Sequence, residues 1–195
     1  MRPAFDALLD IEDAMADVVA RSTQPALAAI KLAWWRDRLE DLDEGKIPAE
    51  PRLQAAAREL LPRGVKGVEL AALEAGWATL VAEEPDVEDI AAGGATLFGL
   101  AARLLGSAHP LIAALGRVYA YENVARRGLM TMHRPMGELY GLTTHSFPKR
   151  LRPLTALAAL AARDAKRPLP FEPQATPSRA AALIVHRLTG RLPKP

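Results

Sequence analysis

The sequence contains no cysteine, few aromatic residues and no long apolar run, and each absence excludes a class of protein. The lack of cysteine excludes disulfide bonds, thiolate zinc sites, iron–sulfur ligation and cysteine nucleophiles. No stretch approaches the roughly 18 uninterrupted apolar residues of a membrane-spanning helix, and the first residues lack the layout of a signal peptide. The four histidines are scattered without the spacing of metal ligands: His109, His133, His145 and His186. We therefore expect a cytoplasmic protein without a resident cofactor.

Acidic residues are scarce in the last third of the chain. Residues 1–125 carry 12 Lys and Arg against 20 Asp and Glu, a net charge of −8, whereas residues 126–195 carry 13 against 3, a net charge of +10. This division favours contact between the last third and an anionic partner: a diphosphate, a lipid surface, a nucleic acid or another protein. It is equally consistent with an acidic first part that packs against a basic last part within one fold.

The composition predicts an all-α protein. Alanine and leucine are abundant and aromatic residues make up 5% of the chain, which favours helices over strands. A length of 195 residues suits one domain with one core, so we predict a single-domain helical bundle over 1–195. Proline, glycine and capping residues predict helices over 3–20, 25–43, a short stretch after Pro51, 68–82, 86–105, 110–127, 151–163 and 178–189. A turn or two is expected near 136–140, a Pro-rich loop over 166–177, and a final helix and tail over 178–195.

An acidic stripe follows one side of the first predicted helix. It consists of Asp6, Asp10, Asp13 and Asp17, spaced 4, 3 and 4 residues apart. Carboxylates that face a cavity can hold Mg²⁺ ions bridged to a diphosphate. Carboxylates that face water form the polar side of an ordinary amphipathic helix. The spacing allows both interpretations.

Two other helices carry residues that could line an apolar cavity. Trp34 and Trp35 lie in the second helix, which is apolar on two sides and is expected to lie between neighbours. These rings could contact a hydrocarbon chain or fill the core. Gly94 is one of three glycines within the helix over 86–105. Inside a helix, each glycine lowers the stability of the helix by about 1 kcal/mol relative to alanine. Close helix packing or room for a bound chain would explain that cost.

Three segments, taken in order, resemble the squalene/phytoene synthase family. They are Pro25-Ala26-Leu27 with Ile30-Lys31-Leu32-Ala33-Trp34-Trp35-Arg36 and the later Pro48-Ala49-Glu50-Pro51; Gly94-Ala95-Thr96-Leu97-Phe98-Gly99; and Leu115-Gly116-x-Val118-x-x-x-x-Asn123-Val124-x-Arg126. They are similar to the family's tryptophan-pair helix with its proline loop, to its glycine-bearing helix and to its "LGxAxxxxNIxRD" segment. The resemblance covers mainly residues 5–130.

The resemblance implies a helical bundle of the isoprenoid (terpenoid) synthase type. In catalytic members, two aspartate-rich motifs around a central cavity hold the Mg²⁺ that assists head-to-head joining of two prenyl diphosphates. By this resemblance the candidate metal and diphosphate residues are Asp10, Asp13, Asp17, Arg126 and Arg127. The candidate cavity residues are Trp34, Trp35, Gly94, Phe98, Tyr119 and Asn123.

The second motif departs from the family at Arg127, which stands where the family has an aspartate. Between Gly128 and Tyr140 the sole acidic residue is Glu138. A cation in place of a metal-binding carboxylate repels Mg²⁺. We therefore predict a protein that has lost prenyl condensation and that binds a lipid, an isoprenoid or a protein partner, with an assembly-type role and no assigned catalytic residue.

The alternative is an active Mg²⁺-dependent prenyltransferase that acts on farnesyl or geranylgeranyl diphosphate. In that case Asp13 and Asp17 would hold Mg²⁺, while Arg126 and Arg127 would bind the diphosphate directly. Peripheral contact with a membrane is compatible with both interpretations, because basic residues attract anionic lipids. No nucleic-acid partner is expected, because the basic residues of the last third match no nucleic-acid-binding motif.

Overall fold

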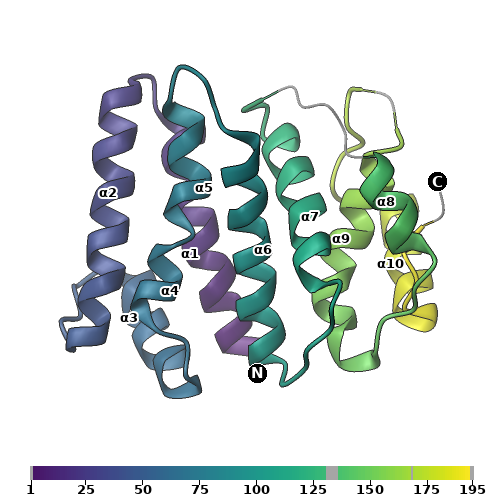
Figure 1. The fold of residues 1–195 in the computed structure, drawn as a ribbon, viewed down its shortest axis with the longest axis horizontal. Helices are drawn as coiled ribbons and strands as arrows, with labels where there is room; N and C mark the ends of the chain where they lie inside the picture. The colour runs from purple at the N-terminus through teal and green to yellow at the C-terminus, as the bar shows by residue number, and fades with distance from the viewer. Residues whose placement is uncertain (1, 131–135, 168, 194–195) are drawn as a thin grey trace.

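Helices arranged side by side form the molecule, with α2 at one end of the row and α10 at the other (Figure 1). The computed structural model describes residues 2–130, 136–167 and 169–193. The α-helices are α1 (Arg2–Arg21), α2 (Pro25–Asp41), α3 (Pro51–Glu59), α4 (Gly67–Ala71), α5 (Glu74–Ala78), α6 (Val87–Leu104), α7 (Ile112–Arg126), α8 (Met136–Thr143), α9 (Arg152–Asp164) and α10 (Pro177–Thr189). Short 3₁₀ turns are η1 (Leu42–Glu44), η2 (Leu61–Arg63), η3 (Thr79–Val81) and η4 (Lys149–Leu151). Since these ranges contain no β-strand, the predicted all-α class is confirmed.

Local signals set most helix ends where the sequence predicted them. Pro25 occupies the first turn of α2, and the carboxylate of Asp86 caps α6 by accepting a hydrogen bond of 2.7 Å from the Glu88 N–H. Gly106 follows α6 with a φ of 61°, a left-handed conformation that ends a helix at low cost in glycine. Residues 131–135, residue 168 of the predicted Pro-rich loop and residues 194–195 of the predicted tail lie outside the described residues.

The single helix predicted over 68–82 is wrong, because α4, α5 and η3 divide this segment. The Leu73 N–H bonds to the carbonyl of Leu70, three residues back, so the chain tightens between α4 and α5. Gly76 of α5 then lies against Gly93 of α6, where a Cβ atom would come within 3.2 Å of the Gly93 Cα. The break allows this segment to contact both α2 and α6.

The core is built around α1, α6 and α7. Leu8, Ile11 and Met15 on the apolar side of α1 are fully buried, and α1 contacts α2, α3, α5 and α6. The most extensive helix pair is α6 with α7, where Gly94 lies directly against Gly116: a Cβ on Gly94 would lie 2.3 Å from the Gly116 carbonyl oxygen. Close packing therefore explains Gly94, and the space beside it is filled by the backbone of α7.

The second helix does not lie between neighbours on both sides as predicted. Trp35 and Leu39 pack into the core, whereas Ile30 and Trp34 are exposed. Helix α2 lies at the end of the row, with neighbouring helices on one side (Figure 1). The indole rings of Trp34 and Trp35 contact each other edge to face with centroids 5.3 Å apart. The sequence pattern of two apolar sides cannot distinguish a central helix from an edge helix with an uncovered face.

A buried histidine attaches α10 to α9. The His186 Nδ1–H donates to the Arg191 carbonyl oxygen over 2.9 Å, which leaves Nε2 to accept from the Thr155 hydroxyl at 2.9 Å. Burial lowers the pKa of His186, so the neutral ring is favoured.

None of the helices in the described ranges combines the length and the hydropathy that crossing a bilayer requires.

Candidate functional site

Arg127 connects the acidic stripe of α1 with the end of α7. Its Nη2 donates to Asp13 Oδ1 over 2.5 Å, and its Nη1 lies 3.8 Å from Asp17 Oδ1. Asp17 also pairs with Arg21 of its own helix at 3.0 Å, while Asp10 is exposed. The stripe thus faces outward, and a guanidinium bridges its last two carboxylates.

Contacts from three helices fix the Arg127 side chain. Its Nε donates to Asn123 Oδ1 over 3.2 Å, and its guanidinium carbon lies 5.9 Å from the ring centroid of Trp77 on α5. Asn123 and Asp13 of α1 accept hydrogen bonds at the edge of the planar guanidinium, and the Trp77 ring lies against one of its faces. Arg127 is therefore held in one position, between the carboxylates that the family resemblance assigns to metal.

Five of the predicted site residues surround one cavity of about 260 Å³. They come from α1 and the end of α7: Asp13, Tyr119, Asn123, Arg126 and Arg127. The opposite wall comes from α9, α10 and the loop between them, and includes Leu157, Leu160, Asp164, Gln174 and Arg179. The lining therefore combines three guanidinium groups with carboxylates, amides and two leucine side chains. The volume of the cavity is close to that of the smallest pockets that bind small ligands in proteins, about 300 Å³.

The structure does not bring the remaining predicted residues to this cavity. Asp10 of α1 and Trp34 of α2 are exposed, and Trp35 of α2 is buried in the core. Phe98 is fully buried against the ring of Tyr119, with centroids 5.3 Å apart. Gly94 lies in the contact between α6 and α7. These residues contribute to packing or to the surface.

A second cavity lies inside the bundle and has the size of one water molecule. It measures about 10 Å³ and is lined by Glu12, Trp77, Gly94 and Asn123, among others. Asn123 lines both this cavity and the 260 Å³ cavity, and its Nδ2 atom is buried without a hydrogen-bond partner among the described residues. A single water suits such a polar site, whereas a prenyl chain does not fit.

Glu12, which the sequence analysis did not single out, is a buried carboxyl group beside this small cavity. Burial raises its pKa to about 7, the nearby Asp13 adds to the rise, and a hydrogen bond from the Trp77 indole opposes it. The sequence contains a signal for it, since Leu8, Glu12 and Met15 share one side of α1. An acidic residue on the apolar side of a helix is a candidate for a shifted pKa.

The contribution of Glu12 to the free energy of unfolding is expected to fall as the pH rises from 4.5 to about 7, the interval between the ordinary and the raised pKa of Glu12. In this interval the unfolded chain ionises Glu12 while the folded chain retains the proton, so deprotonation favours unfolding. Glu12→Gln removes this dependence and keeps an oxygen that can accept from Trp77. At pH 8 the variant should exceed the wild type in free energy of unfolding by up to about 3 kcal/mol.

Urea denaturation of both proteins at pH 4.5 and at pH 8 measures this effect. The two proteins should differ little at pH 4.5, where Glu12 is largely protonated in the folded state. A difference that is the same at both pH values would contradict the ionisation of Glu12 as its cause.

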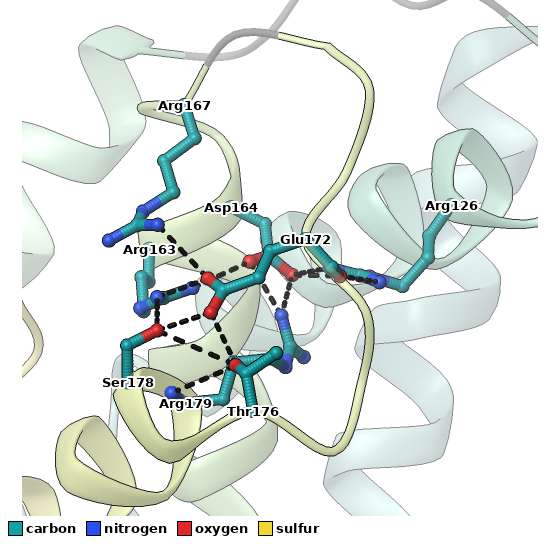
Figure 2. Close-up of polar contacts among 8 residues, drawn as sticks. All are labelled: Arg126, Arg163, Asp164, Arg167, Glu172, Thr176, Ser178 and Arg179. Atoms are coloured by element: carbon teal, nitrogen blue, oxygen red, sulfur yellow. Dashed lines mark hydrogen bonds and ion pairs between the residues drawn. The ribbon is translucent and has the colours of Figure 1, made fainter.

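Arg126, Asp164 and Arg179 of the cavity lining belong to an arginine cluster. Figure 2 shows this cluster, in which Arg126, Arg163, Arg167 and Arg179 surround Asp164 and Glu172. Asp164 is 3% exposed and accepts hydrogen bonds from Arg126 and Arg179, both at 2.7 Å. Arg163 lies 3.4 Å from the same carboxylate. Arg126 also lies over the ring of Phe171, 4.9 Å from its centroid. Arg126, at the end of α7, thus bonds to a residue of α9.

Glu172 is the second carboxylate of the arginine cluster. It accepts hydrogen bonds from Arg163, Thr176 and Ser178 and pairs with Arg167 at 3.0 Å. The two hydroxyl donors and the Arg163 guanidinium lower the pKa of Glu172 to about 2. Figure 2 shows that these contacts join the loop before α10 to α9 and to the first turn of α10. Four arginines thus share two carboxylates, which leaves the cluster with an excess of positive charge.

The sequence contains a signal for this cluster too. Beyond Glu138, Asp164 and Glu172 are the sole acidic residues among many basic ones. Isolated acids in a basic segment are expected to be paired, because each lies among several possible cationic partners. The spacing does not identify which arginines pair with them.

The carboxylates of the site do not fit a Mg²⁺ site. Among the described residues, no three Asp, Glu or His side chains converge as a metal-binding group. Asp13 is instead bonded to Arg127, whose charge opposes that of a cation. No family model, curated protein or solved structure matches the chain.

Proposed function

We propose that this chain is a non-catalytic protein similar to the squalene/phytoene synthases, which binds an isoprenoid diphosphate or a related anionic lipid without condensing it. The observation that carries this proposal is the ion pair between Arg127 and Asp13, with Asp17 beside it. A guanidinium is bonded where the resemblance implies a divalent cation. Arg127 thus supplies the positive charge that a metal ion would place between the carboxylates and a diphosphate.

The cavity next to Arg127 supports binding of an anionic head group. Arg126, Arg127 and Arg179 contribute three guanidinium groups to its lining, and guanidinium forks match phosphate oxygens well. Leu157 and Leu160 provide apolar contacts along α9. This combination suits the head of an amphiphile and the first carbons of its chain.

The interior of the bundle argues against the condensation reaction. Joining two prenyl diphosphates requires an enclosed cavity for two hydrocarbon chains, and the space between α1, α5, α6 and α7 measures about 10 Å³. Gly94 and Gly116 bring α6 and α7 into backbone contact. An isoprenoid chain bound at the Arg127 cavity would therefore extend along the surface of α9.

Calorimetric titration with farnesyl and geranylgeranyl diphosphate, with and without Mg²⁺, tests this proposal. We expect binding that does not require Mg²⁺, without release of pyrophosphate. Arg127→Ala should weaken binding by about tenfold or more, because a charge-assisted contact is lost. Arg117→Ala is the matched control, since Arg117 lies on α7 and pairs with Glu88 outside the cavity.

Two results would contradict the proposal. Mg²⁺-dependent pyrophosphate release that disappears in Asp13→Ala and in Asp17→Ala would support the active prenyltransferase instead. Absence of binding in folded protein would exclude both of these isoprenoid diphosphates as ligands. It would redirect the search to protein partners.

A further inference from the structure

An apolar stripe lies on the outer side of α10. This α10 stripe consists of Ala181, Ile184, Val185 and Leu188. Ile184 is 59% exposed and Leu188 is 74% exposed. Two polar residues of the same helix, Arg179 and His186, are buried on its inner side. Most of the bulky apolar side chains of α10 thus point outward, the opposite of an ordinary surface helix.

Basic side chains flank the α10 stripe on both sides. On one side, a groove of about 670 Å³ between α9 and α10 is lined by Lys149, Arg152, Pro153, Ala156, Leu183, His186, Arg187 and Leu188. On the other side, a hollow of about 420 Å³ brings Arg191 beside Val185. Cationic and apolar groups therefore alternate across one face of the molecule.

Among the described residues, no carboxylate pairs with these cations. The two acidic residues beyond Glu138 are Asp164 and Glu172, and both are bonded within the arginine cluster. Within the described ranges no ion pair is formed by Lys149, Arg152, Arg187 or Arg191. Arg152 instead donates to the carbonyl oxygens of Phe147, Arg187 and Leu188. No acidic side chain in the described part of the chain offsets the charge of these four residues.

We propose that this face docks on an anionic lipid bilayer. Ile184 and Leu188 would enter the boundary between head groups and acyl chains, while Lys149, Arg187 and Arg191 would contact lipid phosphates. A helix that lies in the plane of the interface needs this combination of an apolar side and basic flanks. The two grooves beside α10 provide room for lipid head groups next to the inserted side chains.

Charge distinguishes a bilayer from a second copy of the chain. A symmetric dimer through α10 would bring the same cations of both copies together, and like charges at an interface oppose association. Anionic lipid offers charge of the opposite sign. The face shares no residue with the lining of the 260 Å³ cavity, so this proposal does not depend on the proposed function.

Co-sedimentation of the full chain with vesicles tests the proposal. The probes are vesicles of phosphatidylcholine alone and vesicles that also contain about 30% phosphatidylglycerol, for which we expect at least about tenfold stronger binding. Ile184→Gln with Leu188→Gln should lower binding to anionic vesicles by about tenfold. Lys149→Glu with Arg187→Glu should lower it at least as much, and added salt should lower wild-type binding as well.

Ile30→Gln is the matched control, because Ile30 is 66% exposed on α2, at the other end of the row. It should bind vesicles as the wild type does, and circular dichroism should show the same helix content for all variants. Equal binding to neutral and anionic vesicles would overturn the proposal. So would binding that the α10 variants leave unchanged, no binding at all, or a dimer in solution that the same variants dissociate.

Discussion

Gly116→Ala is expected to lower the free energy of unfolding by about 3 kcal/mol or more. A Cβ atom at this position would lie 2.2 Å from the Gly94 carbonyl oxygen and 2.6 Å from its carbonyl carbon. Both are backbone atoms of α6, so no side chain can rotate to make room. The two helices would have to separate, and the contacts along the most extensive helix pair of the protein would weaken. Urea denaturation followed by circular dichroism measures the loss.

Gly99→Ala provides the control within the same helix pair. Gly99 lies in α6 and a Cβ there would meet no atom within 4 Å. Alanine loses less backbone freedom on folding, so this variant should gain about 0.5 to 1 kcal/mol in free energy of unfolding. If Gly116→Ala were as well tolerated as Gly99→Ala, the backbone contact between α6 and α7 would be contradicted.

Asp164→Asn is expected to cost about 3 to 5 kcal/mol of free energy of unfolding, as removal of one partner from a buried ionic network does. The substitution keeps the shape of the side chain and removes its charge. Arg179, whose side chain is 8% exposed, would then lose the carboxylate that it pairs with, and Arg163 would keep only Glu172. Arg126 would lose its contact with α9. Because these contacts hold α10 and the preceding loop, the region after Asp164 should become more sensitive to proteolysis.

Glu88→Gln is the control for this experiment. Its ion pair with Arg117 joins α6 and α7 at 2.6 Å, but the Glu88 side chain is largely exposed. Solvent screens such a pair, and little loss of stability is expected. A loss from Asp164→Asn as small as that from Glu88→Gln would contradict a buried ionic network that fixes α10.

Both predictions depend on contacts between residues far apart in the sequence, and this limits what the sequence alone could predict. The family resemblance pointed to Arg126 and Arg127, and the structure places both beside Asp13, Tyr119 and Asn123 around one cavity. The partner of Arg126 is Asp164, 38 residues away. Several basic residues were available for that carboxylate, and spacing along the chain does not rank them.

Residues of one helix could not be assigned to core or surface without their neighbours. Trp34 and Trp35 are adjacent, and the apolar pattern of α2 offers two sides for burial. Trp35 is buried because α2 packs on that side, whereas Trp34 is exposed because α2 ends the row. The same reasoning applies to the α10 stripe, whose apolar spacing resembles that of a buried face.

The sequence by itself determined the helical class and most helix ends, since proline at a first turn, a capping carboxylate at Asp86 and glycine after α6 act within a few residues. It also determined that the last third carries excess positive charge. The tertiary structure alone decided that Arg127 meets Asp13, 114 residues earlier in the chain, that Glu12 is buried, and that α10 leaves its apolar side uncovered. Ion pairs and burial depend on which helices pack together, and that choice is made by the whole core rather than by any segment of it.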